Sequence, residues 1–197
     1  MRRHPRQPRS RTRRPVHAAL GVTATLALLA GCSRGNPDEA NAADTEYATS
    51  LVSHHAQTLQ LLDLTLGREG LDPQFDTFAD QTRSELFAEV NATTKRLEGW
   101  GENVPKTALE HTHDTTVTYD TSIAGVLSND EMHALEQAKG QAFEQAWLRE
   151  LIAHEEGAVE LATEAAENGQ NATAVTFAEE DKKVHEGRVA DLRRLVK

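Results

Sequence analysis

Residues 47–55 read YATSLVSHH, and residues 147–155 read WLRELIAHE. An aromatic residue, a leucine and a histidine recur at the same places in both stretches, 100 residues apart. The pattern continues with Phe78-Ala79 and Val90, which recur as Phe177-Ala178 and Val189, 99 residues apart. The chain therefore contains a duplicated two-helix unit. Because one amphipathic hairpin cannot bury its apolar faces alone, two of them are expected to pair into an all-α, up-down four-helix bundle.

Breaks in the helical spacing of apolar residues divide the chain from Asp44 onward into four long helices. The first stops at Gly67 and Gly70, and the second begins at Asp72-Pro73, an N-cap followed by proline. It is expected to run to Gly99. The third helix covers residues 140–167, and the fourth carries Val175 to Val196. Between the two hairpins, residues 101–127 are predicted to form a long loop, and a capping box of Ser128 and Glu131 starts a short helix that ends near Lys139.

The first 31 residues have the order of an export signal: seven arginines with no acidic residue, then an apolar run, then Leu29-Ala30-Gly31-Cys32. This ending resembles the box of a bacterial lipoprotein, in which lipid is attached to the cysteine and the chain is cut just before it. We expect residues 1–31 to be the signal peptide, residues 32–43 to be the lipidated cysteine and a flexible tether, and residues 44–197 to be the bundle domain. The alternative is a cut nearby, with Cys32 incidental. The predicted location is the outer face of a bacterial cell membrane.

Charge argues against a nucleic-acid partner. The whole chain has a formal net charge of −10, but the positive residues of the signal segment mask a more acidic domain. After residue 31 the sequence has 14 basic and 31 acidic side chains, a net charge of −17. A polyanion would be repelled by this domain.

Four histidines and one glutamate fall on the apolar faces of the predicted helices. Counting residues from the helix ends places all of them near one level of the bundle, at 1.5 Å of rise per residue. Imidazole with carboxylate suits Zn, Cu(II), Fe or Ni, and bundle cores hold such sites between facing helices. The alternative is a structural polar layer in which His54 or His154 forms a hydrogen bond with Glu89. The candidate metal ligands are His54, His55, Glu89, His154 and His185.

The long loop contains a second candidate site in His111, His113 and Asp114. Two histidines two residues apart meet one metal ion if the segment is extended. The alternative is a solvated polar loop. His133 is expected to cap the short helix or face solvent. Several acidic residues are interpreted as solvated helix faces: Glu155, Glu156 and the run Glu179-Glu180-Asp181.

These motifs resemble the family catalogued as domain of unknown function 305, exported bacterial proteins with a ferritin-like four-helix bundle. The family hallmark, M-I-x-H-H, is matched by Leu51-Val52-Ser53-His54-His55 and by Leu151-Ile152-Ala153-His154-Glu155. The segment from Ser128 to Leu148 is also similar to the sequence pattern of the family. The resemblance covers nearly all of residues 44–197 and implies the same fold.

The resemblance also implies copper or silver binding through histidines and methionines. In this chain the hallmark methionine positions hold Leu51, Leu151, Thr93 and Leu192, and the second-half glutamate is Arg188, whose charge opposes a nearby cation. Either the site has changed towards a His/Glu ligand set, or metal binding has been lost and a scaffold remains. Cu(I) prefers sulfur ligands, so a His/Glu set favours Cu(II) or Zn(II).

The leading functional hypothesis is a membrane-tethered, extracytoplasmic bundle that buffers or delivers Cu(II) or Zn(II). The alternative is a module that binds an envelope protein and in which the histidines are structural. We do not expect an enzyme, because di-iron bundles use Glu-x-x-His pairs on facing helices and the one such pair here, Glu110 to His113, lies in the predicted loop.

Overall fold

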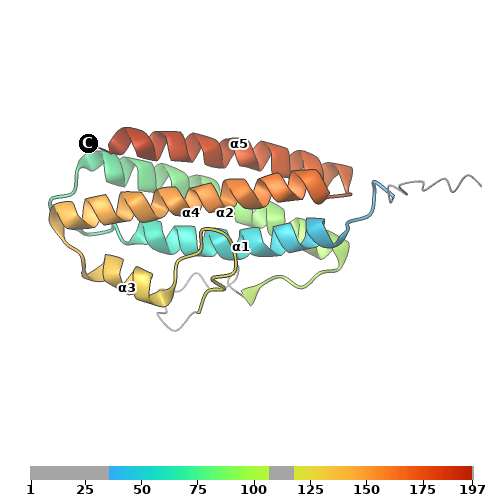
Figure 1. The fold of residues 1–197 in the computed structure, drawn as a ribbon, viewed down its shortest axis with the longest axis horizontal. Coiled ribbons are helices and arrows are strands. Elements are labelled where there is room, and N and C mark those ends of the chain that lie inside the picture. Colours follow the sequence, from blue (N-terminus) through green and yellow to red (C-terminus); the bar gives the residue numbers. More distant parts are fainter. Residues whose placement is uncertain (1–35, 107–117, 197) are drawn as a thin grey trace, which may run out of the picture. The chain divides into compact units, whose positions relative to one another are not determined.

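The computed structural model describes residues 36–106 and 118–196. This part of the chain forms five α-helices and no strand: α1 (Ala42–Asp63), α2 (Pro73–Trp100), α3 (Asn129–Gln137), α4 (Gly140–Asn168) and α5 (Ala172–Leu195). The four long helices lie side by side, α1 with α2 and α4, and α4 with α5, while the short α3 packs against α4 (Figure 1). The predicted all-α bundle of two hairpins is confirmed.

The helix starts follow the capping residues read from the sequence. The Asp72 carboxylate accepts a hydrogen bond from the Gln74 amide at the start of α2, and Ser128 and Glu131 form a complete capping box at α3. Helix α1 begins two residues earlier than Asp44, because Asn41 and Asp44 form a capping box there. It ends at Asp63 and is followed by turns, so the chain leaves the helix before Gly67.

Residues 36–41, within the predicted tether, are bonded to the turn between α4 and α5. The Ala172 amide donates to the carbonyl of Pro37 at 2.9 Å. The Asp44 carboxylate accepts from the amides of Gln170 and Asn171 at 3.0 and 2.9 Å. Amides at the start of a helix have no partner within that helix, so Pro37, before α1, and Asp44, in the first turn of α1, satisfy those at the α4–α5 turn. Cys32 lies outside the described residues.

Apolar side chains fill the bundle on both sides of the histidine level. Towards α3 the core is built around Trp147, whose indole N–H donates to the Leu61 carbonyl at 2.7 Å. Towards the α4–α5 turn it is built around Tyr47 and Leu51, with small alanines from α4 and α5 opposite them. The histidine level is therefore enclosed between two apolar regions of the core, which shield its side chains from solvent.

One segment crosses the bundle beside the histidines. Residues 120–127, here called the crossover segment, are fastened by Gln57, which donates to the Leu127 carbonyl at 2.8 Å and accepts from the Leu127 amide at 2.7 Å. Backbone meets backbone where the segment passes Gly157: a Cβ added there would lie 2.4 Å from the Ala124 carbonyl oxygen. Only glycine allows so close an approach.

Candidate metal centre

The four candidate histidines converge in the core of the bundle. Each is 0 % exposed. The rings of His54 and His154 are stacked, with centroids 3.7 Å apart and planes 14° apart. The His185 centroid lies 6.0 Å from that of His54 and 5.6 Å from that of His55. The histidines of α1, α4 and α5 therefore lie at one level of the bundle, as the helical spacing predicts.

His154 has a structural role in this arrangement. Its Nδ1 donates to the Gly125 carbonyl at 2.8 Å, and its Nε2 accepts from the Thr58 hydroxyl at 2.9 Å. Burial lowers the pKa of His154, so the ring is neutral. Both ring nitrogens are occupied, and the ring links α4 to the crossover segment and to α1.

His54 keeps one free lone pair. Its Nε2 donates to the His154 carbonyl at 2.9 Å, which leaves Nδ1 unprotonated in the neutral ring. Burial lowers the pKa of His54 well below its usual value, and three neighbouring histidines act in the same direction. Nδ1 is buried and has no hydrogen-bond partner among the described residues.

A compact group of potential metal ligands forms where α1 faces α5. His55, Asp181 and His185 each offer one ligand atom, and these atoms lie within 4.8 Å of one another. Neither ring nitrogen of His55 has a hydrogen-bond partner in the part of the chain that the structure covers. Burial lowers the pKa of His55 to about 3, so its nitrogen lone pair is not lost to a proton at neutral pH.

Two further side chains orient these ligands. The Glu155 carboxylate lies 2.6 Å from Nδ1 of His185, and the Tyr47 hydroxyl donates to Asp181 at 2.5 Å. Burial lowers the pKa of His185, but the charges and hydrogen bonds of Glu155 and Asp181 outweigh it and raise the pKa to about 9. Burial likewise raises the pKa of Asp181, but His185, His55 and Tyr47 lower it to about 2. His185 is thus an imidazolium held between two carboxylates.

Glu89 lies at the edge of this group in an ion pair. One of its oxygens is 2.6 Å from the guanidinium of Arg188, and the other is 3.6 Å from Nε2 of His55. Arg188 is buried, and it also lies 3.4 Å from Glu85. The guanidinium therefore joins α5 to α2 directly beside the histidines.

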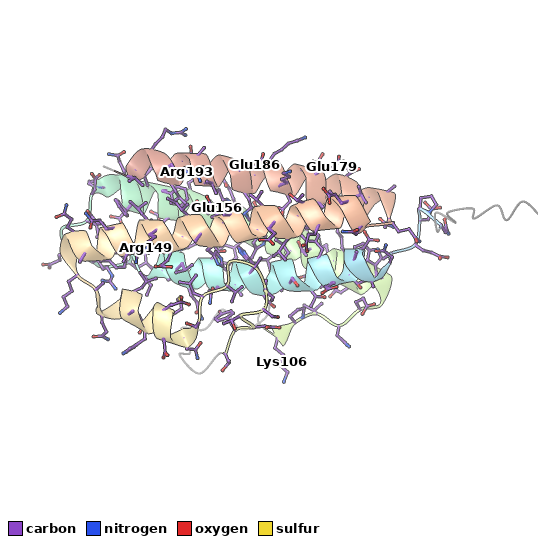
Figure 2. All side chains as sticks on the ribbon, in the orientation of Figure 1. Lys106, Arg149, Glu156, Glu179, Glu186 and Arg193 are labelled. Atoms are coloured by element: carbon purple, nitrogen blue, oxygen red, sulfur yellow. The ribbon has the colours of Figure 1, made fainter. Side chains whose placement is uncertain are left out.

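The interpretation of Glu155 and Asp181 as solvated residues is wrong. They are 0 % and 4 % exposed, respectively, whereas Glu156 and Glu179 are exposed on the outer surface, as predicted (Figure 2). The duplication contains the missed signal: Glu155 stands where the first repeat has the buried His55, and Asp181 stands where it has the buried Thr82. Acidic residues are rarely buried, so residue type predicts exposure at these two positions, whereas the repeat predicts burial.

Other sequence predictions have varied outcomes. His133 is exposed and lies 3.4 Å from Glu136, in agreement with a solvent-facing position. The second candidate site, His111, His113 and Asp114, lies outside the described residues, so its metal binding stays a prediction.

Comparisons with known proteins address the fold. The profile of the family described as "Domain of unknown function (DUF305)" matches residues 44–196. A DUF305 fragment from Deinococcus radiodurans has a similar structure, with a TM-score of 0.66 and 18 % identity over 80 % of this chain and 97 % of that one. A DUF305 protein from Streptomyces coelicolor, assigned as secreted, has a TM-score of 0.63 and 19 % sequence identity over 78 % of this chain and 90 % of that one. CopM in its Cu(II)-bound form has a TM-score of 0.60 and 16 % sequence identity over 77 % of this chain and 94 % of that one.

A search of curated proteins gives no significant match. In the ranges that the structure describes, no helix is long and apolar enough to cross a membrane.

Proposed function

The chain belongs to the DUF305 family, and from that premise we propose that it binds a divalent transition metal ion, Cu(II) or Zn(II), in the core of the bundle. The ligands are His55, Asp181 and His185. The observation that carries this proposal is the convergence of two imidazoles and a carboxylate on one buried point, with ligand atoms within 4.8 Å. Ligands of one ion lie up to about 4 Å apart, so rotamer adjustments of less than 1 Å are sufficient.

The donor set fits such an ion. His55 is neutral, and neither of its buried ring nitrogens has a hydrogen-bond partner within the described ranges. Nε2 of the protonated His185 also lacks a hydrogen-bond partner there, and it becomes a ligand when the metal ion displaces its proton. Glu155 on Nδ1 of His185 matches the carboxylate–histidine pairing that fixes the tautomer of metal-binding histidines. Nδ1 of His54 is a further nitrogen donor nearby, since its ring lies 6.3 Å from that of His55 and 6.0 Å from that of His185.

The chemistry of the site favours Cu(II) or Zn(II). CopM has been described in Cu(II)-bound and Cu(I)-bound forms, so the shared bundle is compatible with copper. In this chain the ligands are nitrogen and oxygen. Met132 belongs to the apolar core around Trp147. Soft sulfur ligands select Cu(I), whereas imidazole and carboxylate suit the divalent ions.

We further propose that the protein works outside the cytoplasm as a metal buffer or chaperone, attached to the outer face of the cell membrane by lipid on Cys32. The support is the basic and apolar segment that ends in Leu29-Ala30-Gly31-Cys32. Labelling of cells with a radioactive fatty acid tests this point. Label in the wild-type chain and none in the Cys32→Ala variant is expected, and equal label in both would contradict lipid attachment.

Metal titration tests the binding proposal. The protein used comprises residues 33–197, which include the whole compact unit 34–197. We expect one Cu(II) or Zn(II) ion per chain with a dissociation constant below about 10 μM by calorimetry. His55→Leu and Asp181→Asn are expected to weaken binding at least about ten-fold, whereas His133→Gln, at an exposed histidine, is the matched control. Wild-type protein that binds neither ion would refute the proposal.

The second candidate function is a module that binds an envelope protein. The observation in its favour is His154, whose two ring nitrogens are both occupied by structural hydrogen bonds. This function predicts that a His54→Gln, His154→Leu double variant still captures the same protein from envelope extract. Loss of capture by a folded double variant would count against it. We propose no catalytic role, and iron-dependent oxygen consumption would contradict that.

A further inference from the structure

A buried cation already occupies the neighbourhood of the candidate ligands. The Arg188 side chain is 5 % exposed, and its Nη2 lies 2.6 Å from Glu89 Oε1 and 3.4 Å from Glu85 Oε2. Its Nε and Nη1 are buried and have no hydrogen-bond partner among the residues described. Buried guanidinium groups normally use their five donors. Arg188 is therefore poorly satisfied where it lies.

Glu89 faces two ways. Oε1 accepts the short bond from Arg188, whereas Oε2 is buried without a hydrogen-bond partner in the described ranges and lies 3.6 Å from Nε2 of His55. A carboxylate at this distance from an imidazole nitrogen is close enough to share a metal ion with it. The bond to Arg188 holds the carboxylate at the edge of the site.

Two effects of Arg188 act in the same direction. Its positive charge repels a metal cation at the neighbouring histidines, and charges interact strongly in a buried site of low dielectric constant. It also neutralises the carboxylate that would otherwise attract the cation. The same charge lowers the pKa of His55 and of Glu155, which places it within electrostatic reach of both.

We propose that Arg188 limits the metal affinity of this site, because it holds Glu89 out of the ligand set and places a fixed positive charge beside the histidines. This inference rests on the proposed metal-binding function. Without the guanidinium, Glu89 joins His55, Asp181 and His185 as a fourth ligand. Arg188 then makes the site suited to an ion that is released again, as a buffer or chaperone requires.

The test is a double-mutant cycle on the protein of residues 33–197. Arg188→Met, Glu89→Gln and the double variant are titrated with Cu(II) and with Zn(II). Arg188→Met is expected to bind about ten-fold more tightly or better, in the range over which residues around the ligands change metal affinity. The gain should disappear in the double variant, because Gln lacks the anionic oxygen. Arg188→Lys retains the charge and is expected to show no gain.

Electron paramagnetic resonance of bound Cu(II) supplies a readout that a purely structural role would not change. The spectrum of Arg188→Met should differ from that of wild type, and Glu89→Gln should abolish the difference. Arg83→Met is the matched control: it removes a half-buried arginine that bonds Asp63 and Asp80. It should leave affinity unchanged. Thermal unfolding checks each variant, and Arg188→Gln replaces Arg188→Met in the cycle if the latter does not fold.

The outcomes separate this inference from the proposed function. Wild type that binds metal together with an Arg188→Met variant that binds no more tightly would overturn the role of Arg188 alone. A gain that survives in the double variant would overturn the assignment of Glu89. Binding by Arg188→Met without binding by wild type would support the role of Arg188 and refute the function. Absence of binding in both would overturn both.

Discussion

Gly157→Ala tests whether the close contact between α4 and the crossover segment holds the histidine core in place. An alanine Cβ at this position would lie 2.4 Å from the Ala124 carbonyl oxygen and 2.5 Å from the Cα of Gly125. Both neighbours are backbone atoms, so no side-chain rotation relieves the overlap. The crossover segment must move away from α4.

The cost follows from the bonds that this movement breaks. The segment is held by two hydrogen bonds with Gln57, of 2.7 and 2.8 Å, and by the 2.8 Å bond from His154 to Gly125. Each contributes about 0.5–1.5 kcal/mol. Alanine returns up to about 1 kcal/mol of helix propensity. We therefore expect a net loss of about 1–3 kcal/mol of unfolding free energy, a fall in Tm of roughly 3–10 °C.

Urea unfolding followed by circular dichroism measures this loss. Gly187→Ala is the matched control, because Gly187 also lies within a helix but a Cβ there meets nothing within 4 Å. The control should be as stable as wild type or up to about 1 kcal/mol more stable. A Gly157→Ala protein as stable as the control would refute the reasoning, since the backbone contact would then be absent in solution.

Three further predictions concern the buried polar groups. The free energy of unfolding should fall as the pH drops from about 6.5 to 5. Burial lowers the pKa of His54, His55 and His154 in the folded state, so only the unfolded chain takes up protons on these residues in this range. His55, with a folded-state pKa of about 3, contributes ~2 kcal/mol of this loss. Urea unfolding at several pH values measures this, and a flat profile would contradict it. The folded state raises the pKa of His185 to about 9, so its contribution to stability is complete below the unfolded pKa of about 6.5 and is lost as the pH rises towards 9. Urea unfolding of the metal-free protein should show a fall in the free energy of unfolding between these pH values, and His185→Gln should abolish that fall. Trp147→Phe should cost about 1–3 kcal/mol, because it leaves the buried Leu61 carbonyl without the indole donor; an unchanged urea midpoint would exclude that bond.

The duplication made the level of the histidines predictable. Helices rise by a constant amount per residue, so residues counted from helix ends and repeated at offsets of 99 and 100 must return to the same height. His54 and His154 therefore stack as near-equivalent residues of two hairpins. Periodicity also placed His185 inside the bundle, since Ala178, Val189 and Leu192 share its stripe.

The ligand group itself was only partly predictable. The charge of Asp181 and Glu155 predicts exposure to solvent, although both lie at positions whose counterparts in the first repeat are buried. A buried carboxylate is stable only if other groups compensate for its burial. For Glu155 the compensating group is His185, on another helix, and for Asp181 it is both Tyr47, on another helix, and His185, one turn further along α5. Only the pair of Asp181 and His185 is visible as a pattern within one helix.

The sequence alone determined the class of fold, the two hairpins, the caps of α2 and α3 and the polar level in the core, because each depends on local spacing or on the repeat. Only the tertiary structure decided which histidines have a free lone pair. The crossover segment and Thr58 occupy both nitrogens of His154, whereas those of His55 have no hydrogen-bond partner in the described ranges and lie beside Asp181. Such differences of a few ångströms arise from helix packing, to which residues far apart in the chain contribute together.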